Sequence, residues 1–500
     1  MKPKIFFWLD NVYPHFGLAK FIQDNFDCEL FSIFDIADKP KIFFQKQKLV
    51  NFSKTWFYHD HILKSKKTPD LEYLKSVEEK YNIPLLLIAL NDRFFNHFNE
   101  FYKFSSDEIL LILEDEIKLY EKILDDVKPD FLIMFETHQQ HNHIFYEICK
   151  ARNIKILLTS TTRIPSQNKS FHSDKFYLTD EIDKFLPLPD TIQPNSNRKK
   201  YSERKITNYK SDESIPESGS ILKYFSAFLK FLSTNDTNVE SHFTYFGRNK
   251  LKVLIKVFFY ELRKKYRESF MREKLDIKIG DGQPFVYFPL HQEQERILLI
   301  GAPFYTNQLE VIEHISKSLP IGYKLYVKDH PVMDVRGWRG VSEMKKIMSL
   351  YNVKLLHYSI DSDEIIKKSS LVISIKGSSA IQAAFHNKPS IIFENIGLYQ
   401  LPSIHKLKCI TELPDAIRSS IKKEVNSKDL EKYLDATKYD TFESSYMQIY
   451  DYFQEEFKVG GYYSNVEIDS QKMMNVFKKF NEEFTELALI HIEKIKEFLK

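Results

Sequence analysis

The chain has 500 residues, 43% hydrophobic and 28% charged, and this length exceeds the size at which a single core stops growing, so two domains are expected. The net charge is +3, from 72 basic and 69 acidic residues, and this balance excludes a dedicated nucleic-acid binder, which needs a basic surplus. Cys28, Cys149 and Cys409 form no CxxC pair, which argues against a disulfide framework or zinc site and favours a reducing cytoplasm. No uninterrupted apolar stretch reaches the roughly 20 residues of a membrane span.

The first half of the chain alternates between strand and helix patterns. Residues 4–9 form an apolar run that ends at Asp10; it is too short for the core of a signal peptide and predicts a buried strand. Residues 106–126 form the clearest amphipathic helix, with Ser106 as the expected N-cap. The pattern of residues 37–104 is mixed, so no helix or strand is placed there from the sequence. A parallel βαβ unit is predicted by the strand, helix and strand patterns at 131–136, 141–152 and 154–160.

These elements predict an N-terminal Rossmann-like domain over residues 1–165. Composition then shifts to Ser, Asn, Lys and acidic clusters, so residues 166–282 are expected to be a linker with a helical insertion, with helical patterns at 221–232 and 249–274. Residues 248–274 combine apolar positions with many Lys and Arg. Such a basic amphipathic helix either lies on an anionic membrane or packs its apolar face between domains.

The second half predicts another Rossmann-like domain over residues 283–425, followed by C-terminal helices over residues 426–500. Its short apolar strands alternate with helical patterns, which predicts a doubly wound sheet. Residues 297–302 are either a further strand or part of a loop. The expected strands are 285–290, 323–328, 353–358, 371–375 and 390–394, and the expected helices are 307–318, 341–350, 361–368 and 378–386.

Ligands of an open parallel sheet bind beyond the carboxyl ends of its strands, and the strand 323–328 ends in polar residues suited to a nucleotide phosphate. Lys328 supplies a positive charge for phosphate. Pro331 holds His330 extended at the strand tip, where its imidazole can donate to a phosphate oxygen or a leaving group. The alternative is an ordinary turn that ends the strand.

Two further strand ends carry candidate donor-site residues. Gly377 permits a close backbone approach, and Ser378 and Ser379 can donate hydroxyls at the start of a helix whose free N–H groups favour an anion. Simple N-capping by one serine is the alternative use of this pair. Glu394, at the end of another strand, could accept hydrogen bonds from ribose hydroxyls, or it is a solvated loop acid.

Segments of the second half resemble the capsule polysaccharide biosynthesis family, which includes Kdo transferases. The His-Pro and Ser-Ser motifs are also similar to those of bacterial sialyl- and polysialyltransferases, which are GT-B enzymes that use CMP-activated acidic sugars. The likeness covers roughly residues 285–425 and the first half only in outline. The segments that carry it are FVYFPLHQEQER (285–296), APFYTNQLEVIEHISKSLP (302–320), YKLYVKDHP (323–331) and ISIKGSSAIQAAFHNKPSIIF (373–393).

The resemblance implies an α/β fold of the GT-B type, with two doubly wound Rossmann-like domains facing a cleft, a helical linker insertion and C-terminal helices. It also implies that Lys328 and His330 contact the donor phosphate and that Ser378 and Ser379 lie beside it. Donor binding in such enzymes generally needs no metal, so neither a metal nor another cofactor is expected.

The catalytic base remains open, because the acidic-acidic-Gly motif of the sialyltransferases has no clear counterpart in the first domain. Glu136 is the first candidate, since a carboxylate beside His138 at a strand tip could take the proton of an acceptor hydroxyl. Asp10, at the end of the first strand, is the second candidate, with His330 as a further catalytic residue. The alternative for each carboxylate is an ordinary loop residue. His138 and His291 are expected to contact the acceptor.

A metal site among the nearby histidines is not expected. His138 and His141 could share a helix face, but His143 would point elsewhere, and no matching carboxylate pair follows. Acceptor contacts or surface positions suit these histidines better.

The predicted function is transfer of a sugar from a nucleotide-activated donor, such as CMP-linked Kdo or sialic acid, to a surface glycan or glycolipid. The alternatives are a CDP-polyol phosphotransferase of the teichoic type and a non-catalytic, glycan-binding subunit of capsule assembly. A nucleotide-sugar epimerase of GT-B shape is a less favoured enzyme. The expected location is the cytoplasm, either free or at the inner face of the membrane through residues 248–274.

Overall fold

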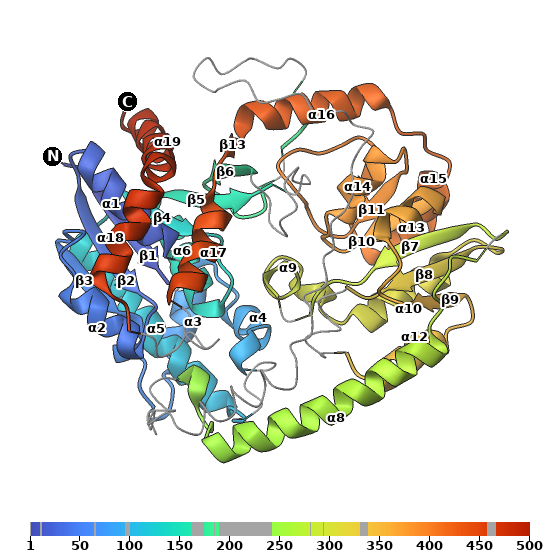
Figure 1. The fold of residues 1–500 in the computed structure, drawn as a ribbon, viewed down its shortest axis with the longest axis horizontal. Helices are drawn as coiled ribbons and strands as arrows, with labels where there is room; N and C mark the ends of the chain where they lie inside the picture. The colour runs from blue at the N-terminus through green and yellow to red at the C-terminus, as the bar shows by residue number, and fades with distance from the viewer. Residues whose placement is uncertain are drawn as a thin grey trace.

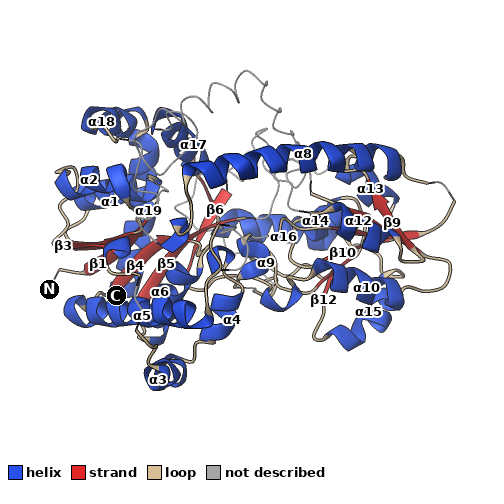
Figure 2. Cartoon of the chain, turned by 90° about the horizontal axis from the view of Figure 1, so that it is seen from below, coloured by secondary structure: helices blue, strands red, loops and turns tan. Residues whose placement is uncertain are grey.

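The computed structural model describes most of the chain and contains two parallel-rich sheets with helices on both faces (Figures 1 and 2). The helical pattern at 221–232 lies outside the described residues. The described ranges are 2–10, 13–64, 67–95, 101–162, 175–184, 186–189, 243–280, 282–293, 295–330, 339–457 and 467–500.

The first sheet has the strand order β13-β6-β5-β4-β1-β2-β3. Strands β1 to β5 run parallel to one another, whereas β6 pairs antiparallel with β5, and β13 pairs antiparallel with β6. The strands are β1 (Lys4–Leu9), β2 (Glu29–Phe34), β3 (Lys54–Phe57), β4 (Phe131–Phe135), β5 (Lys155–Thr161), β6 (Lys175–Thr179) and β13 (Phe442–Glu443).

Strand β1 shows why this half of the chain forms a sheet covered on both faces. Phe6 and Trp8 enter one core, whereas Ile5, Phe7 and Leu9 enter the other. A parallel strand buried on both faces is apolar along its whole length, which is the pattern of residues 4–9.

Helices cover the two faces of this first sheet. The first face carries α3 (Leu71–Tyr81), α5 (Ser106–Val127) and α6 (Gln140–Ala151), and the second carries α1 (Pro14–Asn25) and α2 (Asp38–Lys46). Ser105 caps α5 and forms a capping box with Glu108, so the prediction of Ser106 as the cap is off by one residue.

The second sheet has the all-parallel order β12-β11-β10-β7-β8-β9. Its strands confirm the five predicted ones, with a sixth, β12, at the edge. They are β7 (Phe285–Pro289), β8 (Lys324–Lys328), β9 (Val353–Leu356), β10 (Leu371–Ser374), β11 (Ser390–Ile392) and β12 (Ile404–Lys406).

The predicted helices of this second half are confirmed. The alternative of a strand at 297–302 is wrong, because this segment begins as the short helix α9 and then turns. The helices are α9 (Arg296–Leu299), α10 (Gln308–Ser318), α12 (Val341–Met348), α13 (Ser362–Lys368), α14 (Ser379–Phe385) and α15 (Leu413–Ser420).

The C-terminal part of the chain returns to the first domain. Figure 1 shows α17 (Tyr446–Phe457), α18 (Ser470–Lys479) and α19 (Asn481–Leu499) beside α1. Tyr446 and Phe484 lie in the same core as Phe16, and the Tyr446 hydroxyl lies 2.6 Å from Nδ1 of His15. The long helices α16 (Ser427–Asp440) and α8 (Lys250–Lys274) run between the two halves at opposite edges (Figure 1).

The organisation into two Rossmann-like doubly wound domains, a helical insertion and C-terminal helices is therefore confirmed. Strands β6 and β13 of the first sheet lie outside residues 1–165. The boundaries 1–165, 166–282, 283–425 and 426–500 otherwise stay a prediction. In the described ranges, no helix is both long and apolar enough to cross a membrane.

Candidate functional site

Each sheet has a point where the chain reverses its direction of winding, and ligands of such folds bind in the crevice there. In the first sheet this point lies between β1 and β4, and in the second it lies between β7 and β10. We call these the first and second switch points. The sequence-predicted residues divide between them: Asp10, Glu136 and His138 follow β1 and β4, whereas His291, Gly377, Ser378 and Ser379 follow β7 and β10.

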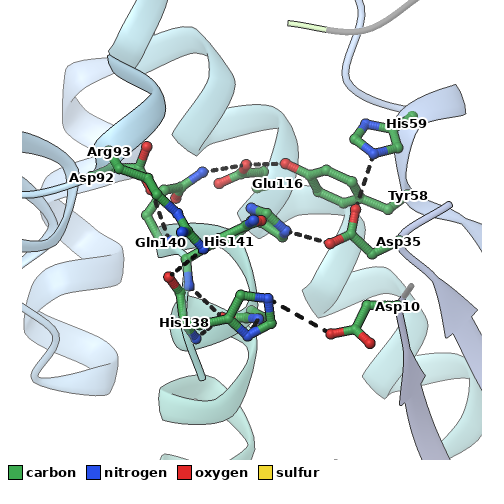
Figure 3. A network of polar contacts seen from close by, with 12 residues as sticks. Asp10, Asp35, Tyr58, His59, Asp92, Arg93, Glu116, His138, Gln140 and His141 are labelled. Carbon is green, nitrogen blue, oxygen red and sulfur yellow. Dashed lines mark hydrogen bonds and ion pairs between the residues drawn. The ribbon is translucent and has the colours of Figure 1, made fainter. Parts of the chain in front are cut away.

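Asp10 and His138 face each other across the first switch point (Figure 3). Nε2 of His138 lies 3.8 Å from Oδ2 of Asp10, and the two side chains are 29% and 13% exposed. Burial, with a further contribution from the positive charge of Arg93, lowers the pKa of His138 to about 4. The imidazole is therefore neutral at pH 7.

Glu136 points toward the second domain, where it forms an ion pair with Arg296. Oε1 accepts a hydrogen bond from the Ser160 hydroxyl, and Oε2 lies 3.4 Å from Nη1 of Arg296 on α9. Both side chains of this ion pair are nearly buried, at 12% and 10% exposure. Both carboxylate oxygens of Glu136 are thus engaged by Ser160 and Arg296, and the side chain is directed away from Asp10 and His138.

The ion pair belongs to a cluster that joins the carboxyl ends of both sheets, which we call the interdomain ion cluster. Arg296 also lies 3.3 Å from Asp183, which follows β6, and Asp183 lies 3.0 Å from Nζ of Lys376, which follows β10. Lys376 also donates to the backbone oxygen of Asn395 at 2.7 Å. The members Glu136, Arg296, Asp183 and Lys376 therefore bring the two switch points toward one another.

A buried polar network lies behind Asp10 and His138 (Figure 3). Asp35, which follows β2, has Oδ2 at 2.7 Å from Nε2 of His141 and Oδ1 at 3.0 Å from Nε2 of His59. Burial alone would raise the pKa of the Asp35 carboxyl, but the charges and hydrogen bonds of the two histidines hold it well below its usual range. Burial alone would lower the pKa of His141, but the charge and hydrogen bond of Asp35, together with the charges of Glu116 and Asp92, raise it overall. The His141 ring stacks on that of Tyr58 with the centroids 4.7 Å apart.

The network continues to a second buried carboxyl, Glu116 on α5. Its Oε1 accepts hydrogen bonds from the Tyr58 hydroxyl and, at 2.7 Å, from Nε2 of Gln140. Burial raises the pKa of Glu116 to about 7 and also raises that of Asp92, whose Oδ2 accepts from the backbone N–H of Gln140 at 3.0 Å. These bonds fix the start of α6 and hence the position of His138.

Sequence reasoning missed this network, because Asp35 and His59, which connect it, follow strands β2 and β3, and neither strand was assigned. Residues 29–34 form an apolar run that ends at Asp35, which repeats the pattern of residues 4–9 and Asp10. This repeated pattern is the sequence signal from which a second polar strand end, at Asp35, could have been predicted.

The second switch point is built around His291 and Gly377. Nε2 of His291 accepts a hydrogen bond from the backbone N–H of Lys376 at 3.2 Å. A Cβ on Gly377 would lie 2.6 Å from the Ser374 hydroxyl and 3.0 Å from Nε2 of His291, so the position requires glycine. His291, predicted to contact the acceptor, thus lies beside the residues predicted to bind the donor.

The serines that follow Gly377 do not cap helix α14 with their side chains. Ser378 occupies the N-cap position without a capping hydrogen bond, and its hydroxyl lies 3.4 Å from Nε2 of Gln382. The Ser379 hydroxyl is buried, with no hydrogen-bond partner in the described part of the chain. N-capping, the alternative to a ligand contact, is therefore wrong for this pair.

The remaining candidates occupy the rim of the second sheet. Lys328 is buried, and its Nζ donates to the backbone oxygen of Ile360 at 2.9 Å, so the fold itself uses this ammonium group. Nδ1 of His330 lies 3.3 Å from the side-chain amide of Gln292. Glu394 lies 3.7 Å from Lys406. Pro331 lies outside the described residues.

The strand end that carries His330 is held by a buried arginine that the sequence analysis missed. The Arg339 side chain is 1% exposed; its Nε lies 3.0 Å from Oδ2 of Asp329, and its Nη2 lies 2.7 Å from Glu293. A third carboxylate, Glu343, contacts Nη1. Arg339 thus fixes the residue directly before His330.

No model of a known protein family matches the chain, and no curated protein matches it. Solved structures to which the chain is similar include UDP-GlcNAc 2-epimerase from Methanocaldococcus jannaschii in complex with UDP-GlcNAc and UDP (13% identity, 85% of this chain and 94% of that chain, TM-score 0.26). Another is Thermosulfurimonas dismutans KpsC, a beta Kdo 2,7 transferase (9% identity, 63% of this chain and 89% of that chain, TM-score 0.27). A third is the N-terminal domain of Candida albicans trehalose-6-phosphate phosphatase (10% identity, 88% of this chain and 93% of that chain, TM-score 0.29). At these TM-scores the likenesses carry no argument about function, and the strand orders define the fold.

Proposed function

We propose that the protein is a glycosyltransferase that binds a nucleotide-activated sugar at the second switch point and its acceptor at the first. The observation that carries the proposal is the placement of polar groups at both switch points. Asp10 and His138 mark one, and the other is marked by Gly377 and the buried Ser379 hydroxyl, which has no hydrogen-bond partner among the described residues. The interdomain ion cluster links the strand ends at these two points, as transfer between bound molecules requires.

The proposed donor is a CMP-linked acidic sugar such as Kdo or sialic acid, bound without a metal, and the acceptor is a capsule or lipopolysaccharide glycan. The resemblance of residues 285–425 supports this choice of sugar class. His330, Gly377, Ser378 and Ser379 would contact the nucleotide and its phosphate, with Glu394 near the ribose. Lys328 is the least suited of the predicted contacts, because its ammonium group already donates to Ile360.

For the base, the geometry favours the Asp10–His138 pair over Glu136. In the proposed reaction the acceptor hydroxyl oxygen bonds to the anomeric carbon, while the bond from that carbon to the phosphate oxygen breaks. The electron pair leaves with CMP, and the hydroxyl proton passes to His138 or Asp10. Asp10 and His138 lie together at the first switch point, whereas the Glu136 carboxylate is engaged by Ser160 and Arg296.

A transfer assay with a labelled glycan acceptor and mass analysis of the product tests the proposal. The donors are CMP-Kdo, CMP-sialic acid, CDP-glycerol and UDP-GlcNAc. We expect a product with one added acidic sugar, formed only from a CMP-linked donor and lost in His330→Ala. Transfer of glycerol phosphate would indicate the teichoic-type reaction, and a sugar isomerised without acceptor would indicate an epimerase. No turnover of any donor, with glycan binding unchanged in His330→Ala, would favour a non-catalytic subunit.

Variants of the candidate bases distinguish their roles. Asp10→Asn and His138→Gln should lower kcat by about 100-fold or more while donor binding survives. His143→Gln, within helix α6 and with its Nδ1 3.1 Å from the Thr137 hydroxyl, is the matched control and should keep most activity. Full turnover in Glu136→Gln would remove that residue from the mechanism. If Glu136→Gln alone abolished transfer, the assignment of Asp10 and His138 would be wrong.

A further inference from the structure

Helix α8 presents a row of large apolar side chains to solvent. The exposed fractions are 68% for Leu251, 49% for Ile255, 62% for Phe258, 52% for Phe259, 49% for Leu262 and 61% for Tyr266. In the described part of the chain these positions are not packed against a domain, so the alternative of an apolar face buried between domains is wrong for them. We call these six residues the α8 stripe.

The ends of α8, by contrast, are anchored. Phe246, just before the helix, lies in a core of the first domain, whereas Met271 and Leu275, at its C-terminal end, lie in a core of the second. Figures 1 and 2 show the helix running along one edge of the molecule from one domain to the other. The helix is therefore fixed on the folded protein, with its middle facing outward.

The α8 stripe is a single continuous face. Successive residues of an α-helix are rotated by about 100°, so the six positions fall within an arc of roughly 100°. A helix of 25 residues is about 37 Å long, and the stripe covers more than half of that length. Apolar side chains scattered singly over a surface need no partner, but a contiguous stripe of this size marks an interaction site.

Basic side chains border the stripe on both sides. Residues 248–274 contain ten Lys and Arg against three Asp and Glu. With the same helical rotation, Lys252 and Arg263 lie along one border of the stripe, and Lys265 and Arg272 lie along the other. All four side chains are exposed. An apolar band between two basic borders is the pattern of a helix that lies in the plane of a bilayer interface.

We propose that α8 docks the protein on an anionic membrane surface, with the α8 stripe inserted among the lipid headgroups and the basic borders contacting them. The positive charge of the two borders favours a lipid surface over a second copy of the protein as the partner of the stripe. A second copy would bring basic borders together, whereas anionic lipid complements them. This docking does not depend on the proposed sugar transfer. If the transfer also holds, docking would bring the switch points near lipid-linked acceptors.

Flotation of the full-length protein on a density gradient tests the docking. Vesicles of phosphatidylcholine with 30 mol% phosphatidylglycerol should carry the protein upward, and vesicles of phosphatidylcholine alone should not. The double variant Phe258→Ser/Phe259→Ser removes the centre of the stripe and should lose flotation. Because each Lys or Arg contributes about a fivefold factor in binding, Lys252→Glu/Arg263→Glu/Lys265→Glu should weaken it by about 100-fold or more.

Matched controls separate docking from general effects of the substitutions. Tyr351→Ser changes a 95% exposed aromatic residue of the second domain, and Lys367→Glu/Lys422→Glu/Lys428→Glu reverses three exposed lysines outside α8; both should float like the wild type. Thermal unfolding should be unchanged in every variant, because all these side chains are exposed. Failure of the wild type to float with anionic vesicles would overturn the proposal, as would undiminished flotation of the Phe258→Ser/Phe259→Ser variant. Self-association through α8 without vesicle binding would likewise contradict it.

Discussion

Replacement of Asp35 by Asn tests the buried network behind the first switch point. The Asp35 side chain is 10% exposed and pairs with His141 and His59, which are 1% and 11% exposed. Removing one partner of a buried ion pair costs about 3–5 kcal/mol. Because the Asn amide keeps the shape and one hydrogen-bonding oxygen of the carboxylate, we expect the lower end, a loss of about 3 kcal/mol near pH 6.

The effect should depend on pH in a defined direction. The folded pKa of Asp35 is depressed, so its contribution is present above the unfolded value of about 4 and is lost as pH falls. The folded pKa of His141 is raised, so its contribution is complete below the unfolded value of about 6.5 and is lost as pH rises through the folded value. The difference between Asp35→Asn and the wild type should therefore be largest between about pH 4 and 6.5 and should shrink at alkaline pH.

Urea unfolding followed by tryptophan fluorescence measures this difference. Trp8 and Trp56 lie in the core of the first domain, and the Trp8 ring centroid is 5.7 Å from that of His141. A Trp338→Phe background makes these two residues the only tryptophan probes. Asp126→Asn, which removes an exposed pair with Lys54, should change stability by less than about 1 kcal/mol. A loss below 1 kcal/mol in Asp35→Asn, or one independent of pH, would refute the reasoning.

Three further substitutions test how the switch points are held. Arg296→Met should destabilise the protein by about 3 kcal/mol in urea unfolding, because it leaves the Glu136 carboxylate without its cation and Asp183 with Lys376 alone; adding Glu136→Gln should restore part of the loss, and simple additivity would contradict the pairing. Gly377→Ala should lower the melting temperature and weaken nucleotide binding through the close contacts of its Cβ, whereas Gly340→Ala, whose Cβ has 3.6 Å of clearance, should do neither. Arg339→Met should lower the free energy of unfolding by at least about 3 kcal/mol and raise the KM for the donor. An unchanged KM would show that Arg339 does not position the donor site.

Much of the fold could be predicted because its strands are buried on both faces. The apolar runs at residues 4–9, 131–136 and 285–290 identify central strands, and their polar ends mark the switch points. The βαβ spacing then gives the order of the neighbouring strands. Strand β3 escaped notice because only two of its four residues, Trp56 and Phe57, are buried.

The contacts between distant segments could not be predicted from local patterns. Arg296 meets Glu136 only because α9 lies against the end of β4 in the folded protein, and nothing in either segment signals the other. The use of Lys328 as a donor to Ile360 depends in the same way on the turn after β9. Side-chain direction at a strand end is set by packing, so the sequence located the candidate site but not the partners of each charge.

Binding of free nucleotides tests the central claim, a donor site at the second switch point, most directly. Thermal stabilisation would be measured with CMP, CDP, UDP and GDP for the wild type, His330→Ala and Ser379→Ala, with His314→Ala on the exposed face of α10 as the control. A ligand at 100 times its Kd adds about 2.7 kcal/mol of stability, a shift of several degrees. The account predicts a selective shift with CMP that survives in His314→Ala and is lost in the other two variants. No shift with any nucleotide, or a CMP shift retained in both His330→Ala and Ser379→Ala, would contradict it.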